Sequence, residues 1–92
     1  MNTTYAKNRR IRTALLELLK TEYPSALDMR ALQFALDNLG YPMPEARIEA
    51  HLSYLGEKGL VKVSTRRGAG VTLRFAALTA EGWDYLDSEQ AG

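Results

Sequence analysis

Two adjacent arginines, Arg66 and Arg67, have the chemistry and the setting to contact phosphate. They stand in the segment 65–70, where two glycines permit a tight turn and the arginine side chains project. A planar guanidinium donates paired hydrogen bonds to phosphate oxygens, so this segment predicts contact with a nucleic-acid backbone or minor groove. Lys62, just before the segment, adds another positive charge for the backbone. Exposed arginines are common on any loop, so an ordinary solvated loop remains the alternative interpretation.

A second group of candidate contacts lies on one side of the segment 44–58. Its apolar residues recur at i, i+4 and i+7, which gathers them on the inner side of a helix: Ile48, Leu52 and Leu55. The residues predicted to lie near bases fall on the opposite side or at its border: Arg47, Ala50, His51 and Tyr54. The carboxylates of the same helix would repel phosphate: Glu45, Glu49 and Glu57. A solvated helix face with no partner therefore remains equally open.

Catalytic and metal chemistry have little to work with in this sequence. There are no cysteines and a single histidine, His51, so neither a thiolate nucleophile nor a His/Cys metal cluster is possible. The glycine-rich segment 67–70 sits at a hairpin tip and not between a strand and a helix, so it lacks the context of a nucleotide-binding loop. We therefore expect no enzyme activity, no metal site, no cofactor and no small-molecule ligand.

The element that positions both groups is a helix that turns directly into a strand. Gly59 can end the helix in the left-handed conformation, and Leu60 can fold back over Leu55. From Leu60 the apolar period changes to two, which predicts strands at 60–64 and 71–77 joined by the loop 65–70. These strands are expected to present one apolar face to the helices, formed by Val61, Val63, Val71, Leu73 and Phe75.

The remaining elements are helical. A first helix is predicted over 4–22, and a second begins after Asp28 as N-cap and ends at Gly40. The turn 41–44 holds two prolines, and so short and rigid a connection predicts a steep crossing between the second and third helices. A minimal extra strand is expected near 25–27. A short final helix starts after Thr79, while residues 87–92 are expected to fray.

Composition bounds the partners. The 92 residues suit one domain, taken here as 1–92 with its core in about 8–86. Net charge is +1 with a pI near 8.0, below the value of about 9 that nucleic-acid binders often exceed. Basic groups concentrate in residues 1–30 and 61–75, while residues 31–60 are acidic. No apolar run approaches the roughly 18 residues of a membrane span, so we expect a cytoplasmic protein.

Two motifs carry a resemblance to a known class. The runs Leu52-x-x-Leu55-x-x-x-Gly59-Leu60-Val61 and Leu78-Thr79-x-x-Gly82, separated by a short hairpin, resemble small winged helix-turn-helix proteins, most closely uncharacterised ones of Mu-like bacteriophages and prophages. The resemblance implies an α+β fold with a three-helix core, a two-stranded wing and a short C-terminal helix. It also implies a DNA-binding transcriptional regulator, which we expect to be a homodimer because one module buries little surface. A protein-interaction module without DNA binding is the alternative, favoured by the acidic middle of the chain.

Overall fold

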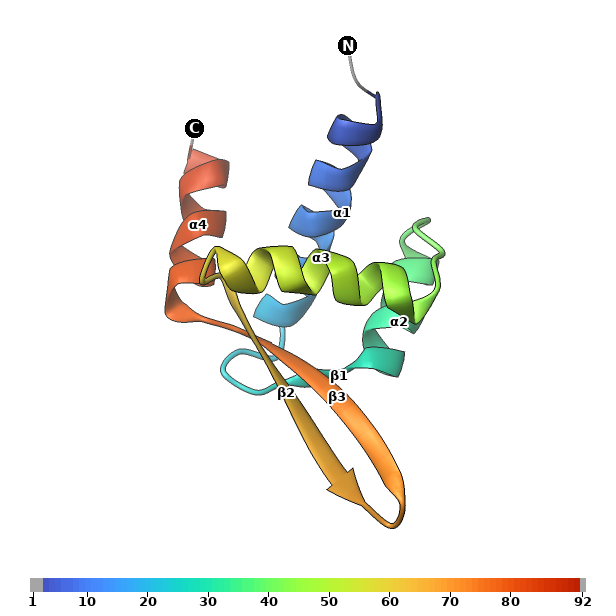
Figure 1. Ribbon diagram of the computed structural model, residues 1–92. Helices are drawn as coiled ribbons and strands as arrows, with labels where there is room; N and C mark the ends of the chain where they lie inside the picture. The colour runs from blue at the N-terminus through green and yellow to red at the C-terminus, as the bar shows by residue number, and fades with distance from the viewer. Residues whose placement is uncertain (1–2, 92) are drawn as a thin grey trace.

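The computed structural model describes residues 3–91 of the chain and the side chains of residues 3–89. The elements of this part follow in the order α1 (Thr3–Lys20), β1 (Leu27–Asp28), α2 (Met29–Asn38), α3 (Glu45–Glu57), β2 (Val61–Gly68), β3 (Val71–Leu78) and α4 (Ala80–Ala91). This is the expected α+β arrangement, including the minimal extra strand before the second helix (Figure 1). Within residues 3–91, none of the helices combines the length and the apolar character that crossing a membrane requires.

The core lies where α1, α2 and α3 meet. Its fully buried side chains come mainly from these helices: Ile11, Leu15, Leu16, Leu19, Leu32, Leu36, Ile48 and Leu52. Asp28 caps α2 as expected, because its side-chain oxygen accepts a hydrogen bond from the Ala31 amide at 2.7 Å. At the other end, Gly40 takes a φ of +90° and the Tyr41 amide donates to the Leu36 carbonyl at 2.8 Å. These caps fix where α2 starts and stops beneath α3.

The predicted helix-to-strand junction is confirmed. Gly59 has a φ of +77°, and the Leu60 amide donates to the Leu55 carbonyl at 3.0 Å, so the last turn of α3 is closed by the residues that leave it. β2 then begins at Val61. The wing therefore follows directly from the closed last turn of α3.

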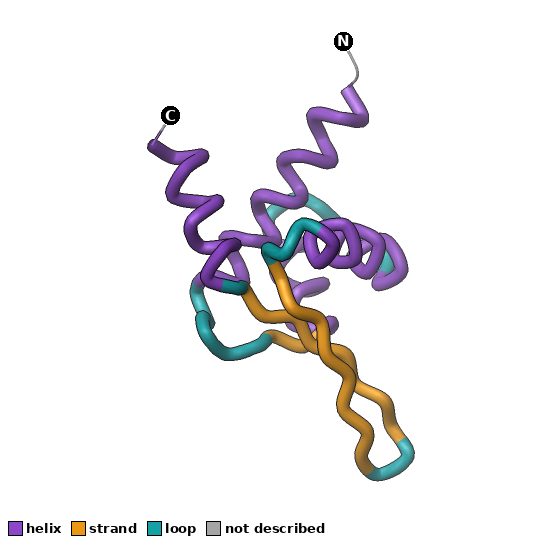
Figure 2. The backbone as a smooth tube through the Cα atoms, turned by 60° about the vertical axis from the view of Figure 1, so that its left-hand side comes forward, coloured by secondary structure: helices purple, strands orange, loops and turns teal. Residues whose placement is uncertain are grey.

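The three strands form an antiparallel sheet in the order β1-β3-β2. The β2–β3 hairpin is longer than expected, because β2 continues through the predicted loop as far as Gly68 and only Ala69 and Gly70 form the turn. Both turn residues have positive φ, +50° and +75°, as a two-residue hairpin turn with the twist of the strands requires. The hairpin extends well beyond the helices in both views (Figures 1 and 2).

The predicted single apolar face of this hairpin is wrong. A two-residue turn pairs odd residues of β2 with even residues of β3, so Val61 lies opposite Leu78 and both are buried. Val71 and Leu73 consequently share the other face with Phe75, and they are 54% and 45% exposed. The expected six-residue loop left this parity undetermined, and the tight turn decides it.

The final helix is also longer than expected. Thr79 caps it, since its hydroxyl accepts from the Gly82 amide at 3.0 Å, and the helix continues to Ala91 where fraying from residue 87 was predicted. Gly92 lies outside the described residues. Ion pairs to α1 hold the added turn, from Asp87 to Lys20 at 3.8 Å and from Glu89 to Arg9 at 3.3 Å.

Candidate nucleic-acid interface

Helix α3 presents a narrow, mostly uncharged strip to solvent. Ala46, Ala50 and Ser53 follow one another at helical spacing and are all exposed, with Arg47 beside them. Small side chains let a helix approach a surface closely, which suits insertion into the major groove. The strip is held outward because Ile48, Leu52 and Leu55 of the same helix are buried in the core.

His51 does not belong to this exposed strip. It is only 6% exposed, and its Nδ1 accepts a hydrogen bond from Arg12 Nε at 3.3 Å. Burial lowers the pKa of His51 below its ordinary value, and the nearby charges of Arg12 and Arg47 lower it further, so the imidazole is neutral at pH 7. The prediction that His51 lies near bases is therefore corrected: its side chain faces α1.

Arg12 is a functional candidate that our sequence interpretation missed. Its guanidinium carbon lies 3.9 Å from the centroid of the Tyr54 ring, so the arginine of α1 stacks on an aromatic side chain of α3. A signal was available in the spacing: Arg12, Leu16 and Leu19 stand at i, i+4 and i+7, which places Arg12 on the side of α1 that faces the core.

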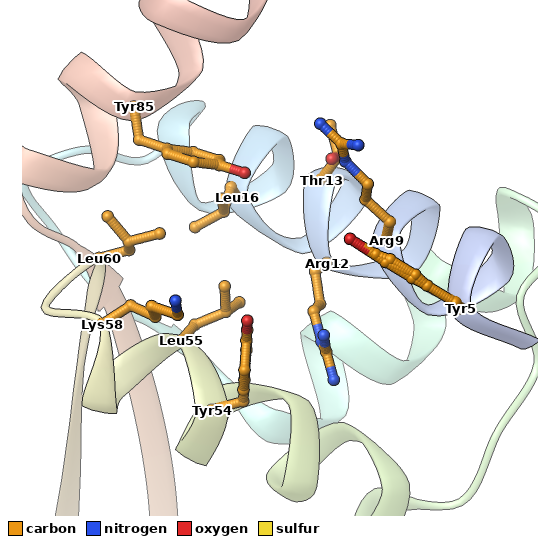
Figure 3. Close-up of a pocket in the computed structure, with 10 residues that line it drawn as sticks. All are labelled: Tyr5, Arg9, Arg12, Thr13, Leu16, Tyr54, Leu55, Lys58, Leu60 and Tyr85. Atoms are coloured by element: carbon orange, nitrogen blue, oxygen red, sulfur yellow. The ribbon is translucent and has the colours of Figure 1, made fainter.

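Tyr54 points away from α3 toward α1, into a cavity between the helices. Figure 3 shows its hydroxyl directed into the space between α1 and α4, with the Arg12 side chain reaching down from α1 beside it. The cavity has a volume of about 270 Å³, and its apolar floor is formed by Leu16, Leu55 and Leu60. Tyr54 remains 38% exposed, so its ring edge lies at the surface while its hydroxyl faces inward.

The arginines of the wing lie within β2 and not in a loop. Successive residues of a strand point to opposite faces, so the side chains of Arg66 and Arg67 lie on opposite faces of the hairpin. Arg66 lies over Phe75 of β3, with its guanidinium carbon 5.0 Å from the ring centroid. Lys62, Arg66 and Arg67 are all exposed, so the wing carries positive charge on both faces.

The acidic flank of α3 is partly neutralised by the wing. Arg74 of β3 lies 2.7 Å from Glu49, measured from Nε to Oε1. The contact is an ion pair without a well-aligned hydrogen bond, because Glu49 Oε1 is buried and accepts no hydrogen bond of acceptable geometry. The charge of Glu49 therefore counts less against phosphate than the sequence suggested, and the pair ties β3 to α3.

Several solved structures resemble this arrangement. The chain superposes on a transcriptional regulator from Thermoplasma acidophilum with a TM-score of 0.79 at 19% identity, over 95% of this chain and 81% of that one. It superposes on a PadR-like transcription factor from Bacteroides fragilis with a TM-score of 0.81 at 15% identity, over 96% and 84%. The chain has a winged-helix fold.

A further winged-helix structure, of Bacillus subtilis PadR in complex with operator DNA, matches with a TM-score of 0.70 at 20% identity, over 86% of this chain and 45% of that one. Identities this low establish a shared fold and no more. No family model matches the sequence, and no curated protein is similar to it in sequence. The resemblance to phage proteins gains no support from these structures and stays a prediction.

Among the described residues, no group of three or more histidine, cysteine, aspartate or glutamate side chains is placed to hold a metal ion. Glu49, beside the wing, is instead paired with Arg74.

Proposed function

We propose that this winged helix binds double-stranded DNA as a small transcriptional regulator, with α3 in the major groove and the wing on the adjacent backbone. The observation that carries the proposal is the pairing of two features on adjoining elements. An exposed strip of small residues on α3 joins, through Gly59, a hairpin bearing Arg66 and Arg67. A protein of the same fold, Bacillus subtilis PadR, was solved in complex with operator DNA, which supports this assignment.

The contacts follow from position on the two elements. Arg47, Ala50 and the exposed edge of Tyr54 would meet base edges or the groove walls. Lys62, Arg66 and Arg67 would neutralise phosphates, because they are exposed on the projecting hairpin.

The test is a fluorescence-anisotropy titration of a random-sequence duplex at several salt concentrations. Binding through phosphates releases counterions, so the logarithm of affinity falls linearly with the logarithm of salt, by about 0.9 for each phosphate neutralised. The double variant Arg66→Ala with Arg67→Ala should flatten this slope by up to about 1.8. Circular dichroism of the variant checks that folding is intact.

A charge-matched control is available on α1. Lys7 and Arg10 are exposed on the side of this helix opposite Arg12, so Lys7→Ala with Arg10→Ala removes the same charge away from the proposed interface. This control should leave the slope nearly unchanged. Equal flattening by both double variants would show that only net charge matters, and the proposed wing contact would be wrong.

We further propose that the protein works as a cytoplasmic homodimer. Two copies would bind two half-sites and double the contact area, which a single module of this size needs for specific binding. Light scattering of the free protein and the stoichiometry of its complex with a selected duplex test this point. A monomer in both measurements contradicts it.

A protein-interaction module is the second candidate, and one observation favours it. Val71 and Leu73 lie exposed on the same face of the wing, where apolar side chains suit contact with a protein surface. Absence of duplex binding at low salt by a folded protein would favour this function over DNA binding.

A further inference from the structure

Helix α3 has a positively charged flank that faces α1. Three of its residues and its C-cap stand at i, i+4, i+7 and i+11, which places them in one row along the helix: Arg47, His51, Tyr54 and the C-cap Lys58. Arg12 joins this row from α1, because it contacts both His51 and Tyr54. The cations of the row thus come from two different helices. Of these, only α3 is the helix proposed to enter the major groove.

These two contacts hold the Arg12 side chain in place. Neither partner carries a negative charge that would neutralise the guanidinium. Tyr54 offers the face of its ring, and His51 accepts a hydrogen bond as a neutral imidazole. The contact with the Tyr54 ring and the bond to His51 together restrict the orientation of the guanidinium, and because the bond uses Nε, the terminal Nη groups remain as its other donors. The planar fork of a guanidinium is suited to a phosphate, whose oxygens accept two parallel hydrogen bonds.

The row is long enough to meet several phosphates of one strand. Lys58 follows Arg47 by eleven positions, a span of about 16 Å at the rise of an α-helix, while phosphates of one strand follow every 3.4 Å or so along the duplex axis. Lys58 Nζ lies 5.5 Å from the centroid of the same Tyr54 ring, so Tyr54 stands between two cations. A strand passing along this flank would meet Arg47, Arg12 and Lys58.

We propose that Arg12 binds a backbone phosphate of the duplex, and that with Arg47 and Lys58 it forms the phosphate contact on the side of α3 away from the wing. This inference rests on the proposed DNA binding. It assigns to α1 a direct part in recognition, and it gives the buried His51 a role in orienting Arg12. The wing would then contact the backbone on the other side of the groove.

The test compares Arg12→Gln with Arg10→Gln in the salt-dependence titration with a random-sequence duplex. Arg10 is an exposed arginine two residues away, about 200° around α1, where it lines a hollow with Tyr41 instead of facing α3. Both variants lose one positive charge. Arg12→Gln should lower the magnitude of the salt slope by about 0.9, and Arg10→Gln should leave it unchanged.

Arg12→Lys separates charge from geometry and guards against a misfolded glutamine variant. It keeps the cation but loses the fork and the Nε donor, so the slope should be retained while affinity falls. An unchanged slope in a folded Arg12→Gln protein overturns the inference, as does a slope lost equally in Arg12→Lys and Arg12→Gln. Failure of the wild-type protein to bind any duplex at low salt is a different result, which overturns the proposed function itself.

Discussion

The closest backbone approach involving a glycine of this fold is at Gly82, and it yields a sharp prediction. Gly82 lies in the first turn of α4, directly against the carbonyl of Leu60 where α3 gives way to β2. A Cβ at this position would overlap the Leu60 carbonyl oxygen and would lie 2.6 Å from Leu78 Cδ1. The leucine side chain can turn away, but the carbonyl belongs to backbone that other bonds hold in place.

The cost of Gly82→Ala can be worked from these contacts. Overpacking a fitted site costs about 1–3 kcal/mol. The Leu60 carbonyl also accepts the Thr79 amide at 3.1 Å, and disturbing that hydrogen bond costs about 1 kcal/mol more. Alanine is favoured over glycine inside a helix by about 1 kcal/mol, which offsets part of this. The net loss in the free energy of unfolding is therefore about 1–3 kcal/mol, or a fall in Tm of roughly 4–8 °C for each kcal/mol.

Gly56 provides the matched comparison, because it is also a helical glycine. The nearest atom to a Cβ built there is the Val61 carbonyl oxygen at 3.9 Å, an ordinary van der Waals distance. Gly56→Ala should therefore raise the free energy of unfolding by up to about 1 kcal/mol.

Urea unfolding measures both glycine variants, followed by circular dichroism and by the fluorescence of Trp83, whose ring packs against Tyr23 with centroids 5.2 Å apart. The reasoning is refuted if Gly82→Ala is as stable as the wild type, or if the two alanine variants shift stability in the same direction.

Three further predictions concern a cap, a buried histidine and an ion pair. Asp28→Ala should lower the free energy of unfolding by about 1 kcal/mol in urea titrations, because it removes the bond to the Ala31 amide, whereas Asp37→Ala near the other end of the helix should change it by less than about 0.5. The pKa of His51 is lowered in the folded state, so the unfolded chain binds the proton more readily; stability should fall as the pH drops below about 6.5, and His51→Gln should remove that part of the pH dependence of Tm. Glu49→Gln frees Arg74 and should strengthen binding to a random duplex while steepening its salt slope by up to about 0.9, and weaker binding would show that the ion pair instead orients the wing for contact.

Much of the fold was predictable because its signals are local. Asp28 and Thr79 as N-caps, Gly40 and Gly59 as helix ends, and the change of apolar period at Leu60 each depend on neighbours in the sequence. Such residues act through hydrogen bonds and dihedral angles within one turn, so the chain carries this information without its tertiary context. The helices, their order and the hairpin follow from them.

The errors concern features that the local signals of the sequence did not specify. Which residues share a face of the hairpin depended on whether the chain turns over two residues or over a longer loop. The run of glycines and alanine is compatible with both, and the chain turns over two. The last turns of α4 meet α1, where Glu89 pairs with Arg9, a residue 80 positions away in the sequence. Neither the register of the hairpin nor the ion pairing between α1 and α4 can be read from the sequence before the elements are placed in space.

The candidate interface divides in the same way. The sequence by itself determined that α3 would bury Ile48 and Leu52, expose Arg47 and Ala50, and lead straight into a wing with arginines, because helical period and backbone geometry are set locally. Only the tertiary structure decided that His51 turns inward to meet Arg12 and that Arg74 covers Glu49. Arg12, Arg74 and Glu49 have long charged side chains with several accessible rotamers, and in each pair the partner that selects one of them comes from a different element of the fold.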